Sequence, residues 1–238
     1  MKSTQQLTPD SALNRLIDGN KRFASGLRSI DSLASSQRRE QLARYGQNPY
    51  AIVLTCSDSR VPAETVFDSG LGDLFVIRVA GNIAAPSLVA SIEFAALSFG
   101  SPLCVVMGHT QCGAIQGAVT GVMKKQNSLT GNLDILLKEI EPAAIQALAA
   151  RSHVNKDHEQ IGSLDKVVSH AIELNVQHTM KELLASSPHL SELTAKGSFK
   201  IVGAVYDIAT GSVRLLDHTA KKRESTSVDN FRVQDSIL

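Results

Sequence analysis

Short apolar runs alternate with amphipathic segments along most of this chain. A doublet typical of a hairpin turn, Thr210-Gly211, leads into a further apolar stretch at residues 213–216, which predicts an antiparallel edge strand. Four longer runs predict strands, at residues 50–55, 74–79, 103–108 and 199–206, and the first of them suits a strand buried on both faces. The alternation predicts an α/β fold, with a mostly parallel central sheet of four strands, the antiparallel edge strand and flanking helices.

The segments between these runs predict helices, because their apolar positions recur three or four residues apart. The expected helices are residues 9–25, a short helix ending near 45, a short helix from 62, and residues 86–99, 113–121, 131–149 and 164–187. No internal repeat or linker divides the chain, so we expect a single domain over 1–238. Within it we expect three parts: an N-terminal helical arm at 1–48, an α/β core at 49–218 and a C-terminal tail at 219–238.

Composition and charge exclude several classes of partner. The 238 residues are 43% hydrophobic and 20% charged, which is ordinary for a globular protein. A net charge of +1, with both signs spread along the chain, gives no reason to expect nucleic acid or a membrane surface as a partner. The polar N-terminus lacks the apolar core of a signal peptide, which predicts a cytoplasmic protein. A periplasmic form with its signal peptide removed would have the same features.

Three cysteines are too few to indicate a disulfide framework, and two of them stand at predicted strand ends. Cys104 lies inside an apolar run and is interpreted as a buried, inert thiol. Cys56 directly follows one predicted strand, and His109 and Cys112 follow another. Parallel sheets bind ligands at the carboxyl ends of their strands, and zinc accepts thiolate, imidazole and carboxylate ligands. These three residues therefore predict a zinc site whose fourth ligand is either water or Asp58.

A charged pair follows the first of these cysteines. Asp58 and Arg60 stand two and four residues after Cys56, and an arginine can hold a carboxylate by two parallel hydrogen bonds. Structural zinc sites usually contain paired Cys-x-x-Cys knuckles and have no use for such a pair, so a catalytic site is predicted. If Asp58 binds zinc the site is closed, and if it pairs with Arg60 a water can take the fourth position. The sequence does not decide between these two arrangements.

The two motifs together, Cys56-Ser57-Asp58-Ser59-Arg60 and His109-Thr110-Gln111-Cys112-Gly113, resemble those of the β-class carbonic anhydrases. The likeness extends to residues 16–23, 78–82 and 203–207. It implies a carbon–oxygen lyase that reversibly hydrates CO2 to bicarbonate and a proton. The implied cofactor is Zn2+, held by Cys56, His109 and Cys112, and Asp58 and Arg60 are implied to gate its fourth position. In carbonic anhydrases themselves zinc lowers the pKa of a bound water to about 7, which implies attack of zinc-bound hydroxide on CO2.

The resemblance also implies where substrate and partner subunit lie. Family members are dimers or multiples of dimers with pockets at subunit interfaces, so we expect a homodimer or homotetramer. Phe75 and Phe94 are implied to line the apolar pocket wall, and Gln47 to hold substrate. Gly113 would let the backbone approach the ion or the substrate closely. The chain has Val53, and no Trp, where a subgroup with an inhibitory bicarbonate site has Trp, which implies a constitutively open site.

Two other functions fit the same motifs. Carbonyl sulfide and carbon disulfide are linear electrophiles like CO2, so a hydrolase of either compound on the same fold is one alternative. The other is a non-catalytic zinc protein used for assembly. The paired Asp58 and Arg60 argue against the second alternative, because a zinc site without catalysis does not require them.

Overall fold

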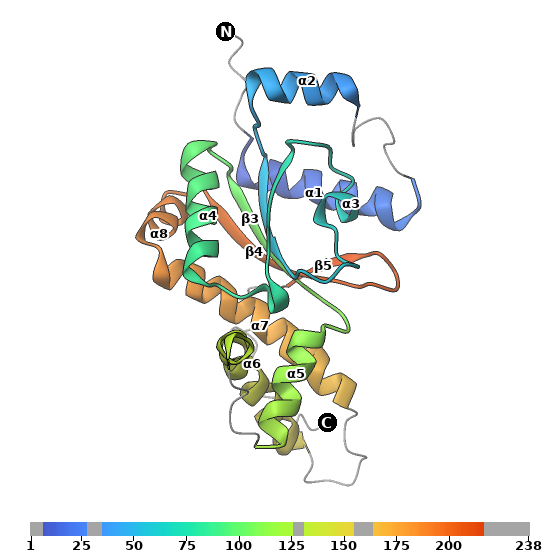
Figure 1. The fold of residues 1–238 in the computed structure, drawn as a ribbon, viewed down its shortest axis with the longest axis vertical. Helices are drawn as coiled ribbons and strands as arrows, with labels where there is room; N and C mark the ends of the chain where they lie inside the picture. Colours follow the sequence, from blue (N-terminus) through green and yellow to red (C-terminus); the bar gives the residue numbers. More distant parts are fainter. Residues whose placement is uncertain (1–6, 28–34, 126–130, 155–163, 217–238) are drawn as a thin grey trace, which may run out of the picture.

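A computed structural model describes residues 7–27, 35–125, 131–154 and 164–216 of the chain. Its core is a five-stranded sheet with helices on both faces (Figure 1). The strands lie in the order β2-β1-β3-β4-β5, and only β5 runs antiparallel to its neighbour. The predicted fold class, four parallel strands with an antiparallel edge strand and an N-terminal helix, is confirmed. The predicted tail at 219–238 lies outside the described residues.

The predicted elements are present with small shifts at their ends. The elements of the structure, in chain order, are α1 (Pro9–Ala24), α2 (Ser36–Tyr45), β1 (Ala51–Thr55), α3 (Ala63–Val66), β2 (Leu74–Arg78), the 3-10 turn η2 (Ala80–Asn82), α4 (Pro86–Ser98), β3 (Leu103–His109), α5 (Gly113–Met123), α6 (Asn132–Val154), α7 (Leu164–Ser186), α8 (Pro188–Ala195), β4 (Lys200–Tyr206) and β5 (Val213–Leu215). The turn η2 and helix α8 were not predicted. Helix α8 begins because the Ser187 hydroxyl accepts a hydrogen bond from the Leu190 N–H at 3.1 Å, with Pro188 at the first helical position.

Side chains of the central strands alternate between two buried layers. Ile52 and Leu54 of β1 point into the layer covered by helices α4 to α8. Ala51 and Val53 point into the opposite layer, which α1 and α3 cover. Cys56, just beyond the strand, continues the first set, so its side chain belongs to the core beneath α5 and α6. Strand periodicity thus determines on which side of the sheet this thiol lies.

The sheet has one point where the chain reverses its direction of winding. After β1 the chain moves outward to β2, and after β2 it returns across β1 to form β3. In open parallel sheets, ligands bind at the carboxyl ends of the strands at such a switch point. Cys56 follows β1 and His109 ends β3, so the two predicted motifs meet there.

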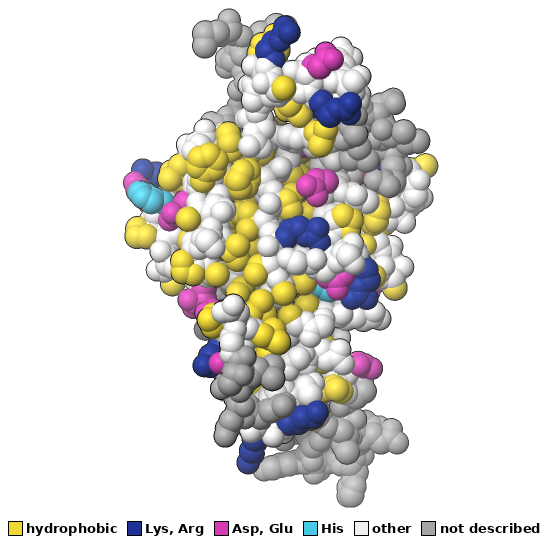
Figure 2. All heavy atoms as spheres, viewed as in Figure 1, with side chains coloured by type: hydrophobic (Ala, Val, Ile, Leu, Met, Phe, Trp, Pro, Cys, Tyr) yellow, Lys and Arg dark blue, Asp and Glu magenta, His cyan; other side chains and the backbone are white. Residues whose placement is uncertain are grey.

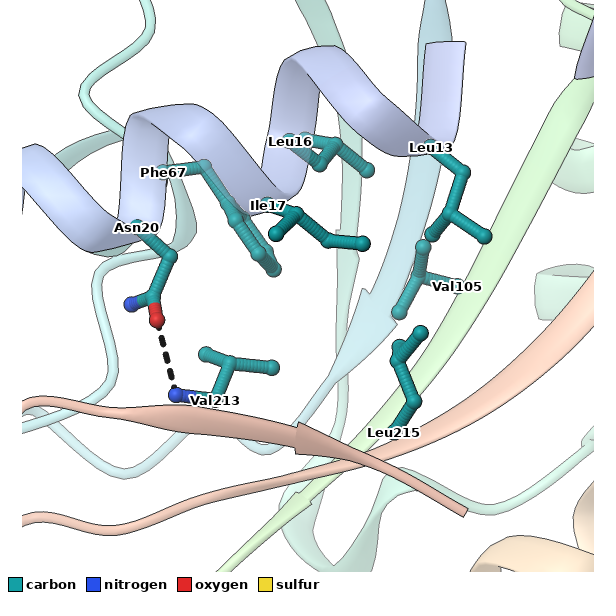
Figure 3. A pocket seen from close by; sticks show the side chains of 8 residues that line it. All are labelled: Leu13, Leu16, Ile17, Asn20, Phe67, Val105, Val213 and Leu215. Atoms are coloured by element: carbon teal, nitrogen blue, oxygen red, sulfur yellow. Dashed lines mark hydrogen bonds between the residues drawn. The ribbon is translucent and has the colours of Figure 1, made fainter. Parts of the chain in front are cut away.

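Helix α1 packs on the sheet of the same chain and encloses a small cavity against it. Leu16 and Phe67 line this cavity together with residues of β3 and β5 (Figure 3). Its interior volume of about 10 Å³ is about the space of one water molecule. Asn20 closes one end, since its Oδ1 accepts a hydrogen bond from the Val213 N–H at 2.8 Å. The cavity lies in the layer opposite Cys56 and is too small for a substrate pocket.

Candidate metal centre

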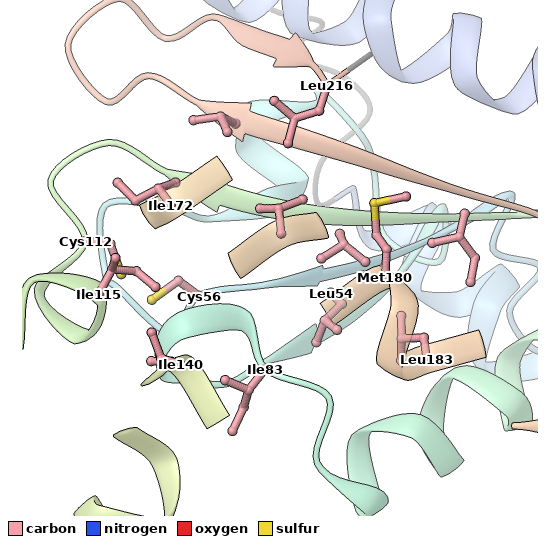
Figure 4. Close-up of a cluster of buried hydrophobic side chains, with 14 of the residues drawn as sticks. Leu54, Cys56, Ile83, Cys112, Ile115, Ile140, Ile172, Met180, Leu183 and Leu216 are labelled. Atoms are coloured by element: carbon pink, nitrogen blue, oxygen red, sulfur yellow. The ribbon is translucent and has the colours of Figure 1, made fainter. Parts of the chain in front are cut away.

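The structure brings together the three residues that the sequence predicts as zinc ligands. Potential ligand atoms of Cys56, His109 and Cys112 all lie within 4.8 Å of one another, and all three residues are buried. Figure 4 shows the two cysteines side by side at the end of the buried cluster, next to Ile115 and Ile140. A dry, apolar surrounding strengthens electrostatic attraction to a cation. Residues at the ends of two strands therefore form one compact set of sulfur and nitrogen donors.

The imidazole of His109 has one nitrogen free to bind a metal. Its Nδ1 lies 2.9 Å from the carbonyl oxygen of Thr110, and a carbonyl can only accept a hydrogen bond, so Nδ1 carries the proton. The other nitrogen, Nε2, is buried and has no hydrogen-bond partner among the described residues. An unpaired buried nitrogen is costly, and a second hydrogen bond that orients the ring is usual for histidines that bind metals. This nitrogen fits a zinc ligand.

The two thiols also need a cation between them. A hydrogen bond from Cys112 lowers the pKa of Cys56 below the usual range of a thiol, and the same hydrogen bond raises the pKa of Cys112. The backbone N–H of Asp58 adds a hydrogen bond to the Cys56 sulfur at 3.4 Å. The pair therefore holds one negative charge easily, and a second only if a cation compensates it. Zinc meets that requirement, so the donor set fits the metal.

Beside this donor set, Asp58 is tied to Arg60 rather than to the thiols. The guanidinium Nε donates to Oδ1 at 2.9 Å and Nη2 donates to Oδ2 at 2.7 Å. The Arg60 backbone N–H adds a third hydrogen bond to Oδ1 at 2.9 Å. These hydrogen bonds hold the pKa of Asp58 far below the usual range of a carboxyl group. Arg60 also donates to the Gln111 carbonyl at 3.3 Å, which links the two motif loops.

Two neighbouring contacts were not predicted from the sequence. Arg78, the last residue of β2, donates from Nε to the Cys56 carbonyl at 3.1 Å and from Nη2 to the Asp58 carbonyl at 2.6 Å. The backbone N–H of Gly81 in η2 helps to lower the pKa of the Cys56 thiol. The likeness of residues 78–82 to the family was a signal in the sequence, but it does not say which loop these groups reach.

The residues predicted to bind substrate are not all near the metal centre of the same chain. Gly113 is the first residue of α5 and directly follows Cys112. Phe75 pairs with Ile52, which lies four residues before Cys56. The Cα atoms of Phe75 and Cys56 are therefore about 13 Å apart along the strand direction. Gln47 is exposed before the start of β1, at the opposite end of that strand. Phe94 lies on α4, with its side chain 53% exposed and its ring 6.2 Å from that of Phe75.

Clustered thiol and imidazole groups that could hold a metal ion, beside an ion-paired carboxylate at the switch point of a parallel sheet, are typical of a metalloenzyme of the α/β class. The sequence model of one family, described as carbonic anhydrase, matches residues 51–213. The chain is 35% identical over 211 residues to carbonic anhydrase 2 of Mycobacterium tuberculosis, and the match covers 88% of this chain and 94% of that protein.

Solved structures agree with the sequence matches. The β-carbonic anhydrase CcaA is 29% identical with a TM-score of 0.64, and the match covers 87% of this chain and 88% of that one. A structure described as one of two tetrameric β-carbonic anhydrases from Sordaria macrospora is 25% identical with a TM-score of 0.63, covering 86% of this chain and 96% of that one. The chain belongs to the β-class carbonic anhydrase family.

Members of this family catalyse the zinc-dependent, reversible hydration of CO2, so the predicted class of enzyme, its substrate and its cofactor are confirmed. These matches do not favour the two alternatives, a hydrolase of carbonyl sulfide or carbon disulfide and a zinc protein without catalysis. Among the described residues, no helix is both long and apolar enough to cross a membrane.

Proposed function

We propose that this chain binds Zn2+ through Cys56, His109 and Cys112 and hydrates CO2 at that centre. The observation that carries this assignment is the clustering of the three ligand atoms within 4.8 Å, with the unpaired Nε2 of His109 among the buried atoms. The chemistry that bound zinc supplies is Lewis-acid activation of water near neutral pH. Ile115 and Ile140 pack around the donor set and keep bulk water away from it.

Asp58 orients the attacking water in this proposal. Its pKa is lowered by the hydrogen bonds from Arg60, so the carboxylate is ionised throughout the neutral range. An ionised carboxylate only accepts hydrogen bonds, so Asp58 would take one from the attacking water and direct the oxygen lone pair towards the carbon of CO2. Arg60 holds the carboxylate in place, which supports the open arrangement in which Asp58 is not a ligand.

We further propose that the pocket is completed by a second copy of the chain. Gln47, Phe75 and Phe94 lie far along the sheet from Cys56, so a single chain cannot place all of them in one pocket with that residue. Figure 2 shows hydrophobic side chains gathered over α4 and the edge strand β2. The patch contains Phe94 and Leu97, which are 53% and 54% exposed. An exposed apolar patch of this kind is typical of an interface, which supports a homodimer or a homotetramer built from such dimers.

We also propose that the chain forms one domain and that the protein is cytoplasmic. We take residues 1–48, 49–218 and 219–238 as arm, core and tail of one domain, because α1 shares a buried layer with the sheet. A cytoplasmic location is supported by three free cysteines, which persist in a reducing compartment.

Stopped-flow CO2 hydration by the purified, zinc-loaded protein tests the proposed activity directly. Carbonyl sulfide and carbon disulfide serve as alternative substrates in parallel assays. We expect rapid hydration of CO2 and far slower turnover of the two sulfur compounds. Protein that holds one zinc per chain but does not hydrate CO2 would contradict the proposal.

The proposed interface predicts the effect of a charge on α4. Replacing Leu97 by glutamate would place a carboxylate in the apolar patch, where burial against a second copy is strongly unfavourable. We expect the wild type to be a dimer or tetramer by light scattering, and Leu97→Glu to be a monomer with reduced CO2 hydration. Ile145→Glu, at a residue of α6 that is 51% exposed, is the control and should keep the dimer. A monomeric wild type would overturn the proposed assembly.

A further inference from the structure

The turn η2 is hydrogen-bonded to the loop that carries Cys56. The carbonyl of Val79, the residue directly before η2, accepts hydrogen bonds from the Asn82 N–H of the turn at 3.1 Å and from the Ser57 N–H at 3.3 Å. The Val79 N–H in turn donates to the Thr55 carbonyl at 3.1 Å. Both sequence neighbours of Cys56 are therefore hydrogen-bonded to Val79, so the position of η2 sets the position of the Cys56 backbone.

The backbone of η2 is in a conformation that requires outside support. Gly81 has φ +74° and Asn82 has φ +43°, both in the left-handed region that most residues avoid. A Cβ at Gly81 would lie 2.5 Å from Cδ1 of Ile140, so the turn is also closely packed. Both residues are buried, so their carbonyl groups need hydrogen-bond partners inside the protein.

Helix α7 supplies those partners from almost a hundred residues further along the chain. Asn175 donates from Nδ2 to the Gly81 carbonyl at 2.8 Å, and Thr179 donates from Oγ1 to the Asn82 carbonyl at 3.1 Å. The two side chains are only 1% and 2% exposed, and they lie four residues apart on the same face of α7. Each carbonyl of the turn is therefore held by a separate side chain of one rigid helix.

We propose that Asn175 and Thr179 are positioning residues for the zinc ligand Cys56, acting through η2. By holding the two carbonyls they fix η2, and with it the Val79 backbone to which both neighbours of Cys56 are hydrogen-bonded. Outer contacts that orient a metal ligand are part of its affinity, and their loss typically weakens metal binding by about 10-fold to 100-fold. The inference rests on the proposed ligand set of Cys56, His109 and Cys112.

The pair of variants Thr179→Val and Thr179→Ser tests this inference. Valine keeps the shape of threonine without the hydroxyl, whereas serine keeps the hydroxyl without the methyl group. We expect Thr179→Val to weaken zinc binding by about 10-fold, measured by competition with a chromophoric chelator. The thiolate-to-metal absorption band of the cobalt-substituted protein should shift in the same variant. Thr179→Ser should stay close to the wild type in both measurements, and Asn175→Leu should follow Thr179→Val.

A matched control separates positioning from general stability. Ser101 makes the same kind of buried contact, from its hydroxyl to the Pro49 carbonyl at 2.7 Å, at the opposite end of β1. We expect Ser101→Ala to lower the melting temperature but to leave zinc affinity and the cobalt spectrum unchanged. If Thr179→Val and Asn175→Leu behave like Ser101→Ala, the positioning inference is wrong. If instead the wild type binds no zinc, or Cys112→Ser keeps it, the ligand set itself fails.

Discussion

Replacing Cys112 by serine is expected to release the zinc. Serine has no accessible anionic form near neutral pH, so only Cys56 and His109 would remain as protein ligands, fewer than catalytic zinc sites use. We expect the metal content after dialysis to fall from about one zinc per chain to a small fraction of that value, with CO2 hydration lost in parallel. Elemental analysis and stopped-flow assays of the same preparation measure the two effects.

Cys104→Ala is the control for this variant. Cys104 is also fully buried, but burial raises the pKa of its thiol to about 12, so it stays protonated. Its side chain belongs to the core cluster and its sequence neighbours are apolar residues of β3. The variant should keep one zinc per chain and its activity, with stability reduced by about 1 kcal/mol. Zinc retained in Cys112→Ser, or lost in Cys104→Ala, would contradict the proposed ligand set.

Replacing Asp58 by asparagine is expected to separate metal binding from turnover. Asparagine keeps the size of the side chain but carries no charge, and one of its two polar atoms donates instead of accepting. Arg60 would lose its ion pair, and the attacking water would lose its anionic acceptor. We expect zinc content to be unchanged and kcat to fall by about 10² to 10⁴, the usual contribution of a positioned proton acceptor.

The pH dependence of this loss follows from the lowered pKa of Asp58. A carboxyl group with a lowered pKa stays ionised, and keeps its pairing, until the pH falls through that low value. Asp58 therefore does not titrate in the assay range, and the ratio of wild-type to Asp58→Asn turnover should be constant between about pH 6 and pH 9. A ratio that collapses towards one on the acid side would show that Asp58 becomes protonated there.

Asp18→Asn is the matched control for the same substitution. Asp18 lies on α1, is 61% exposed and pairs with Lys21 at 3.0 Å. A surface pair of this kind contributes little to stability, so zinc content and turnover should equal those of the wild type. Loss of zinc in Asp58→Asn would instead make Asp58 a ligand, and the proposed open arrangement would be wrong.

The residues next to each motif in the sequence were enough to predict the strands and the placement of both motifs. Each motif directly follows an apolar, β-branched run, so strand periodicity and parallel packing place Cys56 and His109 at the carboxyl ends of two strands. The spacing of His109 and Cys112 likewise places them at the two ends of the short turn between β3 and α5. The pairing of Asp58 with Arg60 is also local, since it spans two residues. These features depend on neighbouring residues, and the sequence records neighbours directly.

Contacts between distant segments depended on the tertiary structure. The order β2-β1-β3 makes the two motifs meet, and strand order is a property of the whole sheet rather than of any one run. Arg78 reaches the Cys56 loop, and Asn175 and Thr179 reach η2, because β2 and α7 are packed there by apolar side chains unrelated to the metal centre. The sequence of this protein therefore determined which chemical groups its strand ends carry, and only the folded sheet and α7 decided which backbone groups hold those ends in place.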